Sequence, residues 1–590
     1  MKQEVVKTFV PEAVYTDRQE FLDFFYTQAL EAAHRRSMST VLLGQRRMGK
    51  TEIFKRVVNR LFFEQDPTDP KAVVPVYFSF PDRPPTDQRV LATLYIENFM
   101  RYYFGFYSSR PDIVTGKPTA EDLIRSIESV RSAFPFQSRT FDLILTHYHS
   151  IINGGSVVPI DTAFDIPHRI ADIDDTTTVM FLDEFQNTRL PQYDLDVVGW
   201  FHDSVESPNC PHFVTGSAMG ILAREIIGRG SLYGRFESYP IKPFTEYWGA
   251  ELVLKTARYY QADVTEEMAP VIAERCGGNP FYITAVVRQA TRQGYALDTE
   301  DVLNRILAVD ISSGFIWAEL HDQVTSWIER INDYGITKWV LYLSALEEDE
   351  EINIERIQQE LRERDYQEVS LDTIRQVLVK LSRGDLIDYL QFGNWFRKID
   401  DPILNDFLKV WGKTEVERQN QGRVYQEILE RYDKRERKFH EYKGYLAEVF
   451  MSQILLNSQK KTLPGHYFHS AEDITMPWPF AFVRQRMRLG SGDGQEIDVI
   501  GAAGAEIWVC QSKWVERDPA GIAVLDELLA QAEVVQADMR PRLLRKWLFA
   551  YNGLTKDAES YADEHNILWS ALPEFNELLR HLGLRNLPEL

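Results

Sequence analysis

The run GQRRMGKT, residues 44–51, is the clearest pattern in this chain that could do chemistry. Its glycines let the backbone curl so that successive N–H groups point at one anion, at the positive end of the helix that follows. The lysine adds a charge for the β- and γ-phosphates of a nucleotide, and the threonine hydroxyl can bind Mg²⁺. This is the G-x-x-x-x-G-K-T pattern of a phosphate-binding P-loop. The residues expected to contact ATP and its Mg²⁺ are Gly44, Arg46, Arg47, Gly49, Lys50 and Thr51.

An acidic pair follows a second apolar run, TTVMFLDEFQ at residues 177–186. Carboxylates at the carboxyl end of a central parallel strand lie beside the P-loop in doubly wound sheets. Asp183 is therefore placed to hold Mg²⁺ through water, and Glu184 to orient and polarise the attacking water. An acidic pair after a strand is weak evidence by itself, but it gains weight from the P-loop upstream.

Two single residues could complete a nucleotide site. Ser217, or Thr215 before it, ends a predicted strand at 211–217 and could sense the γ-phosphate, although a hydroxyl at a strand end is as often structural. Arg235 closes the run RGSLYGR and could act as an arginine finger on a nucleotide in the same or a neighbouring subunit. The neighbouring-subunit role would require a homo-oligomer; the alternative is a solvated loop arginine.

A second set of chemical residues lies near the C-terminus. Asp498 is on one predicted strand, and Gln511 and Lys513 are two residues apart on the next, so they share a face. Mg²⁺ could be held by Asp498, the Gln511 amide oxygen and the backbone carbonyl of Ser512, with Glu448 from an upstream helix as a further ligand. Lys513 would then orient and help deprotonate a water that attacks a phosphodiester. The alternative is an ordinary half-buried strand.

The elements that must position these residues suggest several domains, because 590 residues exceed one core and a domain averages about 150. Apolar strands alternating with helical patterns predict an α/β fold. The predicted parts are an ATPase domain at 1–250 with an insertion at about 107–166, a helical lid at 251–330, a winged helix at 331–412, a charged helical linker at 413–436, and an α/β domain at 437–590.

The predicted winged helix consists of helices and then a hairpin that turns at Gly393-Asn394. Its third helix, which could enter a major groove, carries Arg375, Lys380 and Arg383 but also Asp372. The basic residues of this helix are therefore weak evidence for DNA binding. A packing or protein-interaction module is the alternative.

The amino-acid composition limits which partners the protein can bind and which cellular compartment it can occupy. Three distant cysteines argue against a disulfide framework and a zinc site, and no long apolar run or signal peptide exists, so we expect a cytoplasmic protein without membrane contact. The net charge of −22 disfavours non-specific coating of nucleic acid. DNA contact would need local basic patches, such as the alternating arginines Arg484, Arg486 and Arg488 or the run at 540–546.

The motifs GQRRMGKT, VMFLDEFQ, VTGSAMG, LYGRF with PIKPFT, and CGGNPFY occur in the order found in the archaeal-type ATPase family. The chain resembles that family, which lies near the STAND and initiator-type ATPases of the AAA+ lineage, from about Tyr15 to Trp411. The resemblance implies an ASCE-type P-loop fold and places the GGNP turn, residues 277–280, at a lid helix behind the nucleotide. Asp17 stands where relatives usually carry glycine.

The Asp498, Gln511-x-Lys513 spacing resembles the PD-(D/E)xK nuclease superfamily in its Mrr-type and RecB-like branches. Archaeal-type ATPases commonly carry such a restriction-endonuclease-like domain at the C-terminus. Gln511 replaces an acid, which removes a negative charge and implies weaker Mg²⁺ affinity or a preference for Mn²⁺.

Together these patterns predict an ATP-dependent or ATP-regulated nuclease acting on double-stranded DNA, suited by family analogy to defence against foreign DNA or to mobile-element biology. Two alternatives stay open. One is a STAND-like nucleotide switch that binds DNA or a protein without cutting, and the other is a loader that moves proteins onto DNA.

Overall fold

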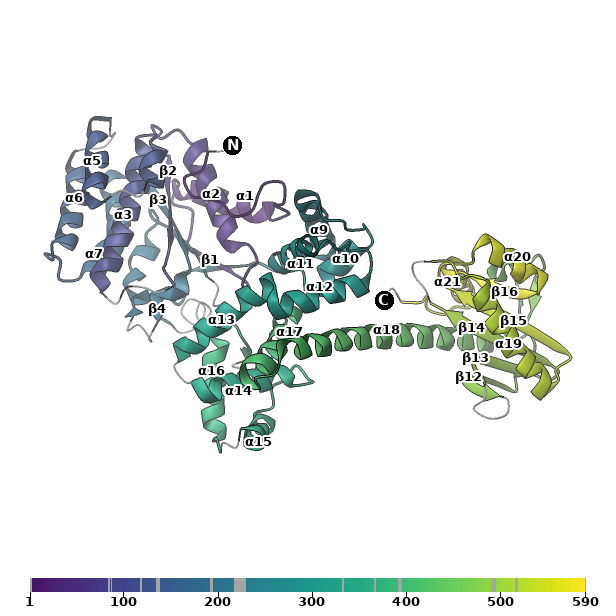
Figure 1. Ribbon diagram of the computed structural model, residues 1–590. Helices are drawn as coiled ribbons and strands as arrows, with labels where there is room; N and C mark the ends of the chain where they lie inside the picture. Colours follow the sequence, from purple (N-terminus) through teal and green to yellow (C-terminus); the bar gives the residue numbers. More distant parts are fainter. Residues whose placement is uncertain are drawn as a thin grey trace. The chain divides into compact units, whose positions relative to one another are not determined.

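The computed structural model describes residues 3–588 except 83, 84, 86, 117–118, 134–137, 191–194, 217–229, 332–333, 366–367, 391–394, 490–494 and 515–517. The chain divides into two compact units, Met1–Leu429 and Glu430–Leu590, which are described separately (Figure 1).

The first unit is built on a five-stranded sheet in which every pairing is parallel. The strand order is β2-β3-β6-β1-β7, so β6 separates the P-loop strand β1 from the acidic strand β3. This arrangement fits the expected ASCE-type P-loop fold. The strands are β1 (Thr40–Leu43), β2 (Val73–Ser79), β3 (Thr177–Asp183), β6 (His212–Thr215) and β7 (Glu237–Pro240).

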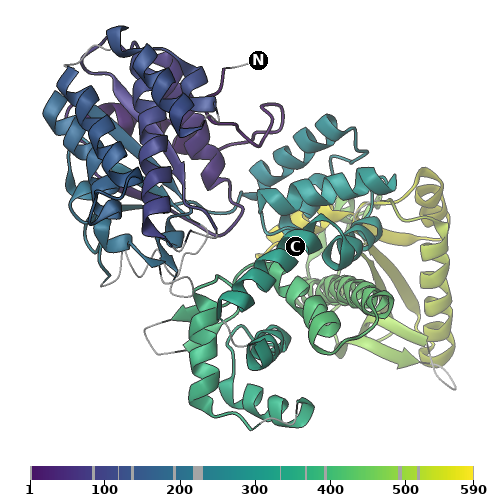
Figure 2. The same cartoon turned by 60° about the vertical axis from the view of Figure 1, so that its left-hand side comes forward.

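Helices cover both faces of this sheet, which is why strands β1, β2, β3 and β6 are nearly continuous apolar runs, whereas the edge strand β7 is mostly exposed. Helices α1 (Gln19–Ala32) and α2 (Lys50–Glu64) pack on one face. Helices α3 (Gln88–Tyr107), α6 (Ser138–Ile152) and α7 (Pro159–Asp174) form the other layer and lie in front of the strands in Figure 2. The stretch 107–166, expected as an insertion, thus contributes α6 and the first half of α7 to this layer, with the short helices α4 (Pro111–Thr115) and α5 (Ala120–Ser129).

The rest of the first unit is helical. The lid consists of α9 (Glu246–Tyr260), α10 (Met268–Arg275), α11 (Pro280–Gln293), α12 (Glu300–Ser313) and α13 (Phe315–Ile331). Three helices and an antiparallel pair of strands follow in the order expected of a winged helix: α14 (Tyr334–Leu346), α15 (Ile354–Arg364), α16 (Leu371–Ser382), β8 (Asp388–Leu390) and β9 (Trp395–Arg397). The expected turn at Gly393-Asn394 lies outside the described residues. Helix α17 (Pro402–Trp411) closes this part.

Helix α18 (Gln421–Asn457) runs without a break through the expected linker, and the division between the units falls within it. The second unit contains a mixed sheet in the order β12-β13-β14-β15-β16. The first three strands pair antiparallel, and the β14–β15 and β15–β16 pairs are parallel. These strands are β12 (Phe482–Leu489), β13 (Gln495–Ala503), β14 (Glu506–Lys513), β15 (Leu543–Ala550) and β16 (Ile567–Ser570).

Two apolar layers hold this second sheet. Helices α18 and α21 (Leu572–His581) bury one face around Trp508, Cys510 and Trp547. Helices α19 (Ile522–Met539) and α20 (Lys556–Glu564) bury the opposite face around Val509 and Leu548. Among the described residues, no helix combines the length and the apolarity needed to cross a membrane.

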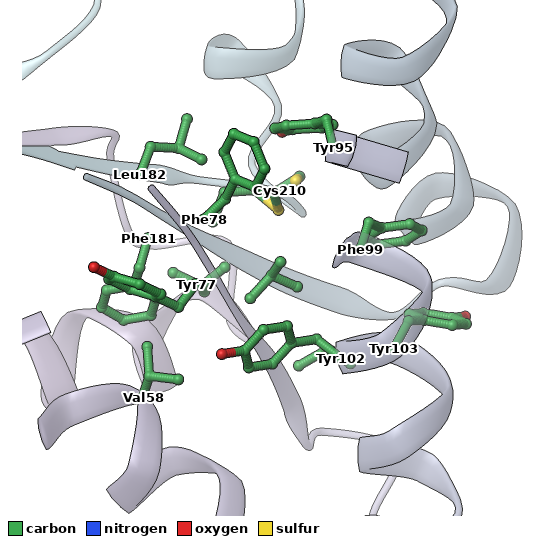
Figure 3. Close-up of a cluster of buried hydrophobic side chains, with 14 of the residues drawn as sticks. Val58, Tyr77, Phe78, Tyr95, Phe99, Tyr102, Tyr103, Phe181, Leu182 and Cys210 are labelled. Atoms are coloured by element: carbon green, nitrogen blue, oxygen red, sulfur yellow. The ribbon is translucent and has the colours of Figure 1, made fainter. Parts of the chain in front are cut away.

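Consecutive residues of the first sheet fill opposite layers, as strand geometry requires. Figure 3 shows Phe181 and Tyr77 beside Val58 of α2, whereas their neighbours Leu182 and Phe78 point toward Tyr95 of α3. Phe181 is fully buried, and its ring meets those of Phe54 and Phe213 edge-on at centroid distances of 5.4 and 5.3 Å. The strand that ends at the acidic pair is therefore fixed by aromatic packing.

Replacing this central ring tests the packing. Phe181→Ala removes a fully buried side chain, so we expect it to lower the free energy of unfolding of the first unit by about 3–5 kcal/mol. Urea denaturation followed by tryptophan fluorescence measures the change. Val157→Ala is the matched control, because this side chain is exposed and its loss should change stability by less than about 0.5 kcal/mol. Similar losses in the two variants would contradict the packing argument.

Candidate functional site

The P-loop connects β1 to α2 in the geometry that its glycines permit. Gly49 caps α2 with φ 88°, a left-handed conformation that favours glycine. Gly44 is required for a different reason: a Cβ there would lie 2.2 Å from Cγ2 of Ile241. The free N–H groups at the start of α2 thus face the loop, as an anion site needs.

Lys50 is buried inside this loop. Its Nζ donates to the carbonyl oxygens of Gly44 at 2.7 Å and Gln45 at 2.6 Å. Burial lowers the pKa of Lys50 to about 8, against the opposing effects of Asp385, Glu184 and Asp183. The ammonium is therefore retained at neutral pH, and its carbonyl contacts can be exchanged for phosphate oxygens.

Asp183 ends β3 beside the P-loop, as the sequence predicts. The Thr51 hydroxyl and the Tyr77 hydroxyl donate to its carboxylate, the latter at 2.8 Å, and the Glu184 N–H donates at 2.9 Å. Burial and then Glu184 raise the pKa of Asp183 to about 6, while these hydrogen bonds oppose the rise. The two expected Mg²⁺ ligands, Thr51 and Asp183, are thus in contact. Glu184 adopts φ 51° and accepts a hydrogen bond from Gln186.

These groups line one cavity of about 830 Å³, a volume suited to a nucleotide. The N-terminal segment forms another part of its wall, where Asp17 and Arg18 adopt φ 52° and 68°. The conformation of Asp17 is one that glycine adopts most easily, which fits the glycine usual at this position in the family that the sequence resembles. Arg18 donates to the Lys242 carbonyl at 2.7 Å and stacks over Phe244.

The lid closes the cavity from the other side. Asn279 of the GGNP turn caps α11, and its amide donates to the Arg46 carbonyl at 3.4 Å, so the turn meets the P-loop as the family resemblance implies. Arg47 donates to Gln323 and Glu319 of α13 at 2.8 and 3.1 Å. In this conformation Arg47 therefore makes hydrogen bonds to α13 in place of the expected contact with a nucleotide.

One residue expected at the nucleotide, Arg235, is not brought to the P-loop. Arg235 lies just before β7, whose first residue pairs with Thr40 at the amino end of β1, whereas the P-loop follows the carboxyl end. It forms an ion pair with Glu206 at 3.0 Å and contacts His202. A role at its own P-loop is thus wrong for this conformation, and the role in a neighbouring subunit stays a prediction. Ser217 lies outside the described residues, while Thr215 donates to the Leu42 carbonyl at 3.1 Å.

In the second unit, Glu448 of α18 is held by Arg486 of β12, and Asp498 of β13 lies near both. Arg486 donates to both Glu448 oxygens, at 2.9 and 3.1 Å. Burial, with smaller contributions from Asp498 and Glu496, raises the pKa of Glu448, and Arg486 opposes this rise. Asp498 accepts from the Ser512 N–H at 2.8 Å, and burial raises its pKa as well. The carboxylates are thus held in a partly desolvated site, and the cation bound to Glu448 is an arginine.

Gln511 and Lys513 are adjacent to this site in β14 without touching the carboxylates. Within the described part of the chain, neither residue forms a hydrogen bond or ion pair with Glu448 or Asp498. No group of three or more His, Cys, Asp or Glu side chains is placed to hold a metal in that part either. Gln511 nonetheless carries a buried Oε1 without a hydrogen-bond partner there, which fits a ligand atom whose cation is not part of the structure.

The sequence analysis missed several contributors. Tyr77 holds Asp183, and Asp385, in the turn after α16, is the acid with the largest effect on the pKa of Lys50. Arg486, one of the alternating arginines that could form a basic patch, binds Glu448. Only the strand position of Tyr77 could have indicated its role from sequence.

The searches against protein-family models and curated proteins gave no match. The fold is similar to the Walker-type ATPase PABY2304 of Pyrococcus abyssi, with 17% identity, 68% of this chain and 99% of that chain covered, and a TM-score of 0.43. It is also similar to the Aeropyrum pernix ORC2 protein (15% identity, 72% and 97% covered, TM-score 0.38) and to the ORC1 protein of that organism in complex with DNA (12%, 69% and 96%, 0.36). Likenesses this distant carry no conclusion about what this chain binds.

The raised pKa of Asp183 predicts a pH dependence. An ionised Asp183 can help to hold Mg²⁺ and a protonated one cannot, so the tightening of ATP-analogue binding by Mg²⁺ should be full near pH 8 and lost as the pH falls through about 6. Fluorescence titration with and without Mg²⁺ measures this effect, and Asp183→Asn should lack it throughout. An unchanged Mg²⁺ effect at pH 5 in the unaltered protein would contradict the assignment.

Proposed function

We propose that the first unit binds and hydrolyses ATP. The observation that carries the proposal is the convergence of Lys50, Thr51 and Asp183 at the start of α2, in one nucleotide-sized cavity. Lys50 would exchange its carbonyl contacts for the β- and γ-phosphates, with the N–H groups of the loop around them. Thr51 and Asp183 would hold Mg²⁺, which supplies charge neutralisation on the phosphates when bound. Glu184 would orient the attacking water.

Two substitutions separate binding from turnover. Lys50→Ala should weaken ATP binding about 10-fold or more, because it removes a charge-assisted contact worth about 1.5–3 kcal/mol. Glu184→Gln should retain ATP but slow its hydrolysis about 100-fold or more. Calorimetry and phosphate release measure the two effects, and Lys71→Ala, which removes an exposed lysine between α2 and β2, is the control. Undiminished turnover in both site variants would refute the proposal.

We further propose that the second unit is a metal-dependent DNA nuclease under the control of the ATPase. Its order of helix α18, antiparallel strands β12 to β14, helix α19 and parallel strand β15 supports the PD-(D/E)xK resemblance. So do the partly desolvated pair of Glu448 and Asp498 and the orphaned oxygen of Gln511. These residues would hold Mg²⁺ or Mn²⁺, which supplies Lewis-acid stabilisation of the phosphodiester when bound. Lys513 would orient the attacking water on double-stranded DNA, in defence or mobile-element biology.

A non-cutting switch or loader is the second candidate, and one observation favours it. Arg486 satisfies both oxygens of Glu448, and Lys513 contacts neither carboxylate. In that case ATP would change how the second unit binds DNA or a protein, without phosphodiester hydrolysis.

Plasmid cleavage separates these candidates. We expect products with Mg²⁺ or Mn²⁺ from the unaltered protein, and at least about 100-fold less product from Asp498→Ala and Lys513→Ala, because each removes a group that acts on the reacting atoms. Lys461→Ala, an exposed lysine of the same unit outside these strands, should cut normally. Equal products from the unaltered protein and both site variants would refute the nuclease site. DNA-stimulated ATP hydrolysis without cleavage would identify a loader.

A further inference from the structure

Arg486 is bound to Glu448 at two points. Its Nε donates to Oε2 at 2.9 Å and its Nη2 to Oε1 at 3.1 Å, while the guanidinium lies 5.1 Å from the ring centroid of Tyr445. The Glu448 side chain is only 6% exposed, so it depends on this partner for its charge, whereas the Arg486 side chain is 46% exposed and has water on its other side. The contact is therefore strong yet open to exchange.

The backbone of β12 is distorted at this residue. Arg486 has φ 50°, in the left-handed region that non-glycine residues rarely adopt inside a strand. As a result the consecutive residues Gln485 and Arg486 both contact helix α18. Gln485 donates to Ser452 of this helix at 3.1 Å, and Arg486 donates to Glu448. In a regular strand they would point to opposite faces. The distortion is the kind of local strain that persists where a side chain must be aimed.

The neighbouring arginines do not share this environment. Arg484 lies against the Phe482 ring, and Arg488 pairs with Glu496 across the strands at 3.2 Å. Of the three alternating arginines expected as a local basic patch, Arg486 is thus the one engaged by a buried carboxylate. Arg484 and Arg488 remain at the surface and provide matched controls for a loss of charge.

Asp498 lies opposite Arg486 in the strand register, between the pairs Gln485–Val499 and Met487–Ile497. The guanidinium therefore holds one of the two carboxylates on which a divalent cation would depend, Glu448, and its charge acts on the other, Asp498. Ligation of Mg²⁺ or Mn²⁺ needs carboxylate oxygens, and a cation of charge +2 beside a bound guanidinium would be repelled in a partly desolvated site.

We propose that Arg486 is a built-in counter-cation that competes with the divalent metal for the Glu448–Asp498 pair, so that the metal binds only when the guanidinium leaves Glu448. This inference rests on the proposed nuclease site and adds a gate to it. It explains how the carboxylates stay paired in the absence of metal, and why metal affinity should rise when Arg486 is shortened or neutralised.

Metal binding by the full chain tests the proposal without relying on activity. Mn²⁺ binding is measured by electron paramagnetic resonance in the absence of nucleotide, for the unaltered protein, Arg486→Gln and Arg484→Gln. Arg486→Gln should bind Mn²⁺ about 10-fold more tightly, because the competing charge is gone. Arg484→Gln loses the same net charge at the surface and should stay within about twofold. Adding Asp498→Asn to Arg486→Gln should abolish the gain.

Each result has a distinct meaning. Equal Asp498-dependent affinities in the unaltered protein and Arg486→Gln would overturn the gate and leave the nuclease site standing. Absence of any Asp498-dependent Mn²⁺ binding, even in Arg486→Gln, would overturn both. Because the loss of Arg486 also leaves buried Glu448 unpaired, Arg486→Lys serves as a second variant. It keeps the charge but not the two-point contact, so its affinity should fall between those of the unaltered protein and Arg486→Gln; a value equal to or below that of the unaltered protein would overturn the proposal.

Discussion

A carboxylate taken out of water needs a cation or several donors, and this constraint organises both sites of the chain. In the first unit, Asp183 is almost fully buried and is held by hydroxyls and an N–H group while the Lys50 ammonium lies nearby. In the second unit, Glu448 is held by Arg486. In each site a buried carboxylate therefore has internal partners before a metal arrives, and binding a metal means replacing one of them.

In the first unit, residues of the P-loop interact with helices and turns that follow the α/β sheet in sequence. Arg47 of the P-loop binds α13, the Gln45 amide donates to the Asp400 carbonyl at 3.3 Å, and Asp385 acts on Lys50 from the turn after α16. Entry of a triphosphate would place negative charge where Asp385 acts and compete for the loop cations. Binding of the proposed nucleotide would thus act directly on the contacts between the P-loop and the helices behind it.

Local patterns predicted much of this structure, because they report local physics. The P-loop, the strand ending in Asp183 and the contact of Thr51 with Asp183 follow from glycine placement and parallel-sheet geometry. The alternation of strands and helices likewise indicated both α/β units. The predictions that were wrong concern contacts between residues far apart in sequence, or positions where the backbone conformation is unusual. Strand β7 was not anticipated, so the edge on which Arg235 lies could not be inferred. Arg47 and Gln323 are 276 residues apart in sequence, and the φ of 50° at Arg486 breaks the strand alternation expected of Arg484, Arg486 and Arg488.

We infer that the chain has two separate metal centres, one for a triphosphate and one for a phosphodiester. The number of Mn²⁺ ions bound per chain, counted with saturating Mn²⁺ and a saturating non-hydrolysable ATP analogue, distinguishes two centres from one. We expect Asp183→Asn to lose one ion, Asp498→Asn to lose a different one, and the double variant to lose both. A count that Asp498→Asn leaves unchanged would show that the second centre is absent.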